Sequence, residues 1–191
     1  MRRLLFVRHA ETDLAGRFCG ASDPDVNDRG RAQIAALTPI LQSTFPWDPV
    51  QAVYSSDLRR AASTARAVAE TFGCPVEFTP ALREIDFGEW EGLSWEQIER
   101  ADPVWARAWC SDYPRLPAPG GERFQAFTAR VLREVRRLLD AAGEGEAARN
   151  GALAVVTHAG VLRVVLRELC GLGEQAAWER TRRYCGFFRY P

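Results

Sequence analysis

The chain contains two histidines, and each follows a short run of apolar residues. His9 comes after the apolar residues 4–7 and one arginine, and His158 comes after 152–156 and one threonine. Such runs predict buried strands, and open α/β sheets bind their ligands at the carboxyl ends of their strands. Imidazole is suited to proton or phosphoryl transfer near neutral pH. We therefore expect one site to hold both histidines.

Arginines stand beside the first histidine and after a second predicted strand. Arg8 precedes His9, and Arg59 and Arg60 begin an amphipathic segment that follows residues 51–55. A guanidinium is a permanent cation whose N–H groups match the oxygens of a phosphate. A helix that starts at a strand's carboxyl end adds free backbone N–H groups that favour anions. Helical spacing leaves Arg59 and Arg60 equivalent, and either motif taken singly is more often a solvated feature than a phosphate site.

Carboxyl groups cluster in the segment 82–92, where Glu84, Asp86, Glu89 and Glu91 lie among apolar residues. Beside a phosphate dianion, like charge favours the protonated form of a carboxyl group, which can then donate its proton to a leaving alkoxide. An acidic surface loop has the same composition, so this segment is informative only in combination. Together the motifs supply an Arg-His pair, a further arginine, a carboxyl group and a second histidine. This set predicts phosphoryl transfer through a phosphohistidine.

These residues need a framework of alternating strands and helices. Strands are expected at the apolar runs 3–7, 51–55, 75–79, 152–157 and 187–190. Helices are expected where apolar residues recur at helical spacing: after the capping residue Asn27 to Leu41, and over 57–72, 122–142 and 160–170. The alternation predicts a three-layer αβα sandwich with a mainly parallel sheet.

The chain is expected to form a single domain over residues 1–191. An irregular insert at about 80–121 should cover the site, with short helical pieces near 94–100 and 103–110. A Gly/Glu-rich surface linker is expected at 143–150. The aromatic residues Phe18, Trp90 and Trp95 are expected to pack in a core more often than to stack on a ligand.

Composition excludes several functions. With 25 basic and 25 acidic residues the formal net charge is zero, which argues against a nucleic-acid or membrane partner. Every basic residue is an arginine, which excludes Schiff-base chemistry and a lysine-dependent phosphate loop. The five cysteines lack metal-site spacing, so we expect no metal, no disulfide framework and a cytoplasmic location. Neither a signal peptide nor a membrane span is indicated.

Taken jointly, four motifs resemble the histidine phosphatase superfamily, in its phosphoglycerate-mutase-like branch. They occur in the family's order over nearly the whole chain, at residues 7–12, 54–61, 82–92 and 155–161. Within the family, the short length and the segment 109–128 are most similar to α-ribazole-5′-phosphate phosphatases, which act in cobalamin biosynthesis. The resemblance implies a phosphoglycerate-mutase-like fold and a metal-independent, cofactor-independent phosphomonoesterase.

The resemblance also implies a role for each matching residue. His9 would be the nucleophile that becomes phosphorylated, and His158 would donate to the phosphoryl group. Arg8 and Arg60 would clamp the phosphoryl oxygens, so the family motif selects Arg60 over its neighbour. Glu84 would be the acid for the leaving group and then the base for the attacking water.

The rim of the expected substrate site departs from the family in places. Residue 15 is alanine where the family often has asparagine, so that either a phosphate or substrate contact is missing or Arg17 replaces it. Cys19 stands where mutases often carry threonine, which disfavours mutase-type recognition. Gly20 and Ala159 complete the expected rim.

The substrate is expected to be a small-molecule phosphate monoester, bound by a monomer or homodimer. The alternatives are a phosphoglycerate mutase, a broad-specificity phosphatase, or a non-catalytic phosphate-binding protein on the same fold. A metallohydrolase is disfavoured because two arginines would compete with the cation.

Overall fold

The computed structural model describes residues 4–44, 50–142 and 151–190. Arg3 of the first expected strand and the expected linker 143–150 lie outside these ranges. The described residues include a five-stranded sheet in the order β3-β2-β4-β1-β5. The strands are β1 (Leu4–Arg8), β2 (Val50–Ser55), β3 (Val76–Phe78), β4 (Ala152–Thr157) and β5 (Phe187–Arg189). Only β5 runs antiparallel to its neighbour, β1, which confirms the predicted mainly parallel sheet.

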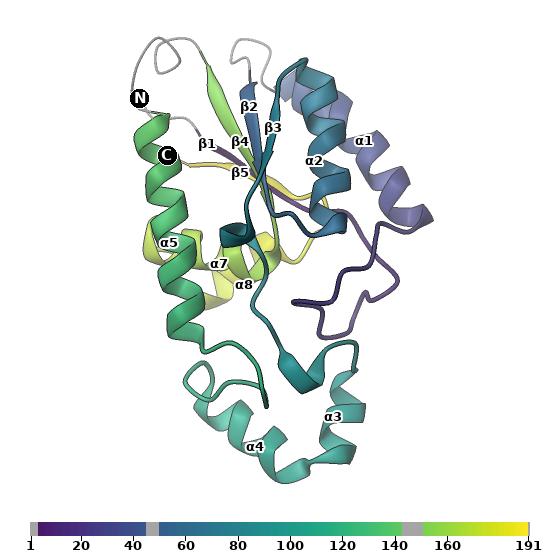
Figure 1. Ribbon diagram of the computed structural model, residues 1–191, viewed down its shortest axis with the longest axis vertical. Coiled ribbons are helices and arrows are strands. Elements are labelled where there is room, and N and C mark those ends of the chain that lie inside the picture. Colours follow the sequence, from purple (N-terminus) through teal and green to yellow (C-terminus); the bar gives the residue numbers. More distant parts are fainter. Residues whose placement is uncertain (1–3, 45–49, 143–150, 191) are drawn as a thin grey trace.

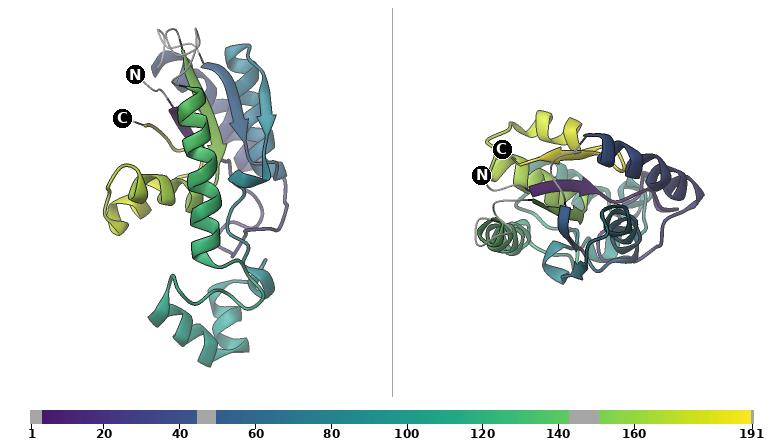
Figure 2. Two further views of the ribbon diagram at one scale, coloured as in Figure 1. Left: turned by 60° about the vertical axis from the view of Figure 1, so that its left-hand side comes forward. Right: turned by 90° about the horizontal axis from the view of Figure 1, so that it is seen from above.

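Alternate residues of the central strands face opposite layers of helices. Leu4 and Phe6 of β1 pack with α5 (Phe124–Ala141) and α7 (Ala159–Glu168) in one apolar cluster. Leu5 and Val7 pack with α1 (Asp28–Thr44) and α2 (Arg59–Phe72) in another. The views in Figures 1 and 2 show these helices on the two faces of the sheet. The predicted αβα sandwich is therefore confirmed.

Local sequence features set the ends of these helices. The side chain of Asn27 accepts a hydrogen bond of 2.8 Å from the N–H of Gly30, which caps α1 as predicted. Gly73 ends α2 with a φ of 64°, a left-handed conformation that favours glycine. The structure adds one helix that the spacing did not predict, α8 (Glu174–Thr181).

The segment between β3 and α5 lies beyond the carboxyl ends of the parallel strands (Figure 1). It contains two short 3₁₀ helices, Pro80–Leu82 and Gly88–Trp90, followed by α3 (Trp95–Ala101) and α4 (Pro103–Asp112). It has an apolar cluster of its own, with Trp90, Ile98, Ala106 and Ala118 buried and Phe18, Phe87, Leu93, Trp95 and Trp109 packed around them. Phe18 and Trp90 thus pack in a core, as expected. None of the helices in the described ranges has the length and apolar character that a membrane span needs.

Candidate active site

Strand register brings the two histidines together. β1 and β4 pair in parallel with Arg8 opposite Thr157, so the next residue of each strand is a histidine at the same edge of the sheet. The ring centroids of His9 and His158 lie 5.0 Å apart. Two residues that are 149 positions apart in the sequence therefore share one site, as the paired apolar runs predicted.

A cavity of about 270 Å³ opens at this edge. Its walls contain four of the five residues expected to carry the chemistry: Arg8, His9, Arg60 and Glu84. The fifth, His158, is fully buried and lies against His9. Arg17, Cys19 and Ala159 of the expected rim also line the cavity, as does Trp95.

The hydrogen bond of His9 fixes its tautomer. Nδ1 lies 2.6 Å from the carbonyl oxygen of Ala10, and because a carbonyl can only accept, Nδ1 must carry the proton. Nε2 is then left with a free lone pair. Burial lowers the pKa of His9 well below its ordinary value, and the positive charges of Arg60 and Arg8 lower it further. At neutral pH the ring is therefore a neutral imidazole with a free lone pair on Nε2.

His158 is held differently. Its Nε2 shares a hydrogen bond of 2.9 Å with the hydroxyl of Ser56, the residue that follows β2. Its Nδ1 is buried without a hydrogen-bond partner. Burial lowers its pKa well below the ordinary value, and Arg60, His9 and Arg8 add to the effect. His158 is thus a neutral imidazole with one nitrogen still able to hydrogen bond.

The structure distinguishes the two arginines that helical spacing left equivalent. Arg60 is 1% exposed, and its guanidinium donates to the carbonyl oxygens of Ser22 at 2.6 Å and Gly20 at 2.8 Å. Arg59 is exposed and pairs with Asp25 at 3.2 Å. Arg60 therefore faces the cavity, and Arg59 faces solvent.

Arg8 lies against the carboxyl-terminal part of the chain. Its guanidinium carbon is 4.0 Å from the ring centroid of Tyr184, and its Nη1 donates to the carbonyl oxygen of Thr181 at 3.0 Å. Burial lowers its pKa from the ordinary value, while Tyr184 and Glu84 oppose that change. Four buried side-chain N or O atoms in the described ranges lack a hydrogen-bond partner, and three of them are Arg8 Nε, Arg60 Nε and His158 Nδ1.

Glu84 is positioned by the start of α7. Its Oε2 accepts a hydrogen bond of 2.8 Å from the N–H of Gly160, and its Oε1 accepts one of 3.0 Å from the N–H of Ile85. Thr157 donates its hydroxyl to the carbonyl oxygen of Leu82 at 2.7 Å, which ties this segment to β4. A Cβ on residue 160 would come 2.1 Å from Glu84 Oε1, so only glycine lets the carboxylate reach the helix.

Arg130 of α5 holds the backbone around Glu84. Its guanidinium donates to the carbonyl oxygens of Arg83 and Glu84 at 2.8 and 2.9 Å, and it pairs with Glu122. No sequence pattern indicates these contacts, because Arg130 is one of several arginines on an amphipathic helix.

Gly20 is the one expected rim residue that does not line the cavity. Its N–H donates to the carboxylate of Glu91 at 3.0 Å, so it is not free to bind a substrate. A Cβ there would come 1.8 Å from the carbonyl oxygen of Ile85. Close packing therefore accounts for the glycine at this position, and a contact of Gly20 with substrate stays a prediction.

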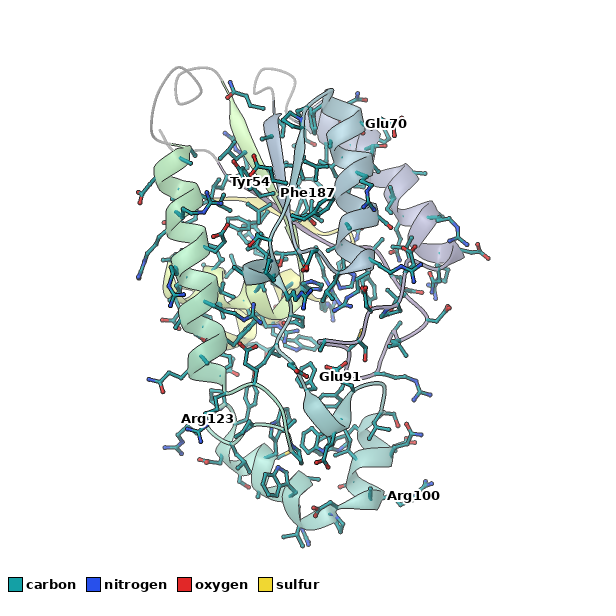
Figure 3. The ribbon with its side chains drawn as sticks, viewed as in Figure 1. Tyr54, Glu70, Glu91, Arg100, Arg123 and Phe187 are labelled. Carbon is teal, nitrogen blue, oxygen red and sulfur yellow. The ribbon has the colours of Figure 1, made fainter. Side chains whose placement is uncertain are left out.

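Glu91 organises this loop. Its carboxylate also accepts hydrogen bonds from the N–H groups of Ala21, Ser22 and Phe87. Figure 3 shows Glu91 where the insert meets the rest of the protein. Burial opposes its ionisation, but these hydrogen bonds outweigh burial and lower its pKa. The carbonyl oxygens that hold Arg60 belong to the same loop.

A second cavity, of about 390 Å³, adjoins the first. Phe18, Glu84, Phe87 and Arg163 line both. Aromatic rings supply much of the remaining wall: Trp109, Tyr113, Phe124, Phe127 and Trp178. Glu84 thus stands between a compartment rich in arginine and histidine and one rich in aromatic rings.

Within the described ranges, no three histidine, cysteine, aspartate or glutamate side chains form a group that could hold a metal ion. The site has a neutral imidazole with a free lone pair, the buried guanidinium of Arg60, the half-buried guanidinium of Arg8, a second imidazole and a carboxyl group. This arrangement suits transfer of a phosphoryl group to imidazole.

Comparison with known proteins agrees with this chemistry. The chain belongs to the histidine phosphatase superfamily (branch 1), whose family model matches residues 4–189, and it is a phosphatase of that class.

Its relatives include the adenosylcobalamin/alpha-ribazole phosphatase of Salmonella typhimurium, 34% identical over 178 residues that cover 92% of this chain and 83% of that protein. The glucosyl-3-phosphoglycerate phosphatase of Mycolicibacterium vanbaalenii is 33% identical over 175 residues, which are 90% of this chain and 76% of that protein. The crystal structure of the alpha-ribazole phosphatase from Shigella flexneri matches with a TM-score of 0.82 and 29% identity, covering 98% of this chain and 89% of that one.

Proposed function

We propose that this phosphatase hydrolyses its substrate through a phosphohistidine formed on Nε2 of His9. The observation that carries the proposal is the single cavity lined by Arg8, His9, Arg60 and Glu84, with His158 against His9. The proton held on Nδ1 of His9 leaves the Nε2 lone pair free to attack phosphorus.

The phosphoryl oxygens would be bound by Arg8, Arg60 and His158. Each of these side chains has a buried nitrogen without a partner. A buried donor without a partner costs about 1–3 kcal/mol, so an anion with several acceptor oxygens would stabilise this arrangement. The tautomer of His158 that accepts from Ser56 at Nε2 would carry its proton on Nδ1 and donate from there.

Glu84 would serve both halves of the reaction. In the first, a bond forms between His9 Nε2 and phosphorus, the ester P–O bond breaks, and Glu84 gives its proton to the leaving oxygen. In the second, the Glu84 carboxylate takes a proton from water, the oxygen of that water bonds to phosphorus, and the N–P bond breaks to release phosphate. Glu84 lines both cavities, which suits a group that serves a phosphoryl group on one side and a leaving group on the other.

The substrate we propose is α-ribazole-5′-phosphate. Two observations support this choice: relatives named as alpha-ribazole phosphatases match this chain over most of its length, and the second cavity has aromatic walls that suit a flat heterocyclic base. We also propose a cytoplasmic location, because all five cysteines are free thiols.

Mass spectrometry of the enzyme mixed with substrate and quenched at alkaline pH, where the N–P bond survives, tests the mechanism. We expect one phosphoryl group on His9, and we expect His9→Ala to lose it together with at least roughly 10³-fold of the activity. Arg60→Ala should weaken phosphate inhibition strongly, whereas its matched control Arg59→Ala should not, because Arg59 is exposed. Full activity in His9→Ala would refute the phosphohistidine.

A panel of phosphate esters tests the substrate. We expect the highest kcat/KM for α-ribazole-5′-phosphate among α-ribazole-5′-phosphate, glucosyl-3-phosphoglycerate, phosphoserine and 3-phosphoglycerate. If interconversion of phosphoglycerates exceeds phosphate release, the protein is a mutase and the phosphatase proposal fails. Equal activity on all four would identify a broad-specificity phosphatase instead.

A further inference from the structure

Residues 181–186, which are the last residue of α8 and the chain that joins it to β5, pack against the side chains that bear the proposed chemistry. We propose that Tyr184 in this segment is a positioning residue that holds the Arg8 guanidinium and the His9 ring in place for phosphoryl transfer. This inference rests on the proposed function, because it assigns Tyr184 a part in forming the phosphohistidine.

Arg8 is held on two sides by the segment. The central carbon of its guanidinium lies over the Tyr184 ring, 4.0 Å from the ring centroid, which is a cation–π contact. Its Nη1 donates to the carbonyl oxygens of Thr181 and Arg182. These contacts use one edge and one face of the guanidinium and leave Nε without a partner. The segment thereby orients the cation while leaving one donor available.

The ring of His9 contacts two other rings. Its centroid is 5.0 Å from that of His158 and 5.7 Å from that of Tyr184. The hydrogen bond from Nδ1 to the Ala10 carbonyl fixes the ring's rotation. Tyr184 therefore touches both the proposed nucleophile and one of its proposed cations, and it lines the cavity that contains them.

The backbone aims Tyr184 at the site by an unusual turn. Cys185 has a φ of 53°, the only positive value at a non-glycine residue in the described ranges. Such conformations carry strain and persist where surrounding contacts enforce them. Here the N–H of Arg8 donates to the carbonyl oxygen of Gly186 at 2.9 Å, and β5 then pairs with β1. The turn is tied to the same strand that delivers Arg8 and His9.

Tyr184 also separates the site from solvent on its far side. An open groove between α1 and α8, separate from the two cavities described above, is lined by Gln33, Leu37, Glu179 and Arg180. Tyr184 lines both this groove and the cavity that contains His9. A smaller side chain at this position would let water from the groove reach Arg8 and His9.

Substitutions of Tyr184 distinguish the contribution of its aromatic ring from those of its hydroxyl group and of its bulk. Tyr184→Phe keeps the ring and should stay within about 3-fold of the parent enzyme. Tyr184→Leu removes the ring, and we expect phosphorylation of His9 to slow by about 10- to 100-fold, because small misplacements of reacting groups have effects of this size. Tyr190→Leu is the matched control, since Tyr190 is a partly buried tyrosine of the same terminal segment that does not line the cavity.

The experiment is rapid alkaline quench of single turnovers with a nitrophenyl phosphate, run at reaction pH values from 5 to 8, with thermal unfolding of each variant. In Tyr184→Leu, water would reach His9 and Arg8 would move, so the acid limb of phosphoenzyme formation should shift to higher pH. A loss that is merely structural would lower the fraction of active enzyme without moving this limb. If Tyr184→Leu does not fold, Tyr184→Met, which retains the bulk without the ring, takes its place.

The inference is overturned if the leucine or methionine variant phosphorylates at the parent rate, or if phenylalanine is as damaging as leucine. It is also overturned if the rate falls with an unchanged pH profile and the same loss of thermal stability as in Tyr190→Leu. A parent enzyme that forms no phosphohistidine would instead refute the proposed function, so the two failures are distinguishable.

Discussion

Replacing Gly160 with alanine should separate the activity of this protein from its stability. The added Cβ would come 2.1 Å from Oε1, 3.0 Å from Cδ and 3.2 Å from Oε2 of Glu84. All three atoms belong to the end of one side chain, so the carboxylate can swing away while the backbone stays in place. Glu84 would then lose the 2.8 Å hydrogen bond from the N–H of residue 160.

The expected effects differ in size. Alanine is favoured over glycine within a helix by about 0.5–1 kcal/mol, and the lost hydrogen bond to a charged group is worth about 1.5–3 kcal/mol, so the net change in stability should stay below about 2.5 kcal/mol. General acid catalysis contributes about 10²- to 10⁴-fold, or roughly 3–5 kcal/mol of activation free energy. The loss of activity should therefore exceed the loss of stability.

Leaving-group dependence makes the assay specific. A displaced Glu84 cannot protonate an alkoxide, so kcat on an alkyl phosphate should fall by the whole contribution of general acid catalysis, about 10²- to 10⁴-fold. Nitrophenolate leaves without a proton, so phosphoenzyme formation from nitrophenyl phosphate should fall much less. Gly173→Ala is the matched control, because the space around its Cβ is open and its φ is −64°. Equal losses on both esters would refute the reasoning, as would an unchanged rate on the alkyl ester.

Three further predictions concern stability. The folded-state pKa values of His9 and His158 lie well below the ordinary 6.5, so below that pH the unfolded chain binds more protons than the folded chain. The free energy of unfolding should therefore be largest above pH 6.5 and fall by about 2 kcal/mol between pH 6.5 and 5.5, as measured by urea unfolding. A flat profile would contradict this. Glu91→Gln should lower the free energy of unfolding by about 1–3 kcal/mol and raise KM, because the Glu91 carboxylate holds the loop that binds Arg60. An unchanged free energy of unfolding together with an unchanged KM would contradict this role of Glu91. Gly20→Ala should destabilise by at least roughly 2 kcal/mol in the same assay, since backbone blocks its Cβ; Gly173→Ala should not.

Most of the fold could be predicted because its signals are local. Fully apolar runs such as that of β4 predict buried strands, and the spacing of α2 and α5 predicts helices that cover them. α8 could not be predicted in this way, because only Ala177 and Thr181 of its residues are buried. A helix with so narrow an apolar stripe has little periodic signal. The division of the chain into one domain with an insert stays a prediction.

The residues of the site differ in how far the sequence alone could locate them. Arg8, His9 and His158 follow strands, so the strand pattern alone brings them to one edge. Choosing Arg60 over Arg59 required the family motif. Helical spacing does not show which of the two arginines is buried, because the burial of Arg60 depends on its contacts with the loop 19–22. The contacts of Tyr184 and Arg130 depend on turns and on long-range packing, which leave no pattern in the sequence.

The two histidines illustrate where sequence reasoning ends. Each follows a buried strand. Burial and the same two arginines lower the pKa of each ring. What makes them unequal is one hydrogen bond each: a carbonyl forces the proton of His9 onto Nδ1, whereas His158 meets a hydroxyl that can donate or accept. His9 thus has a fixed lone pair on Nε2, and His158 can adapt to a phosphoryl group beside it. Because the cations are arginines, they favour the neutral form of the proposed nucleophile while remaining charged to bind its target.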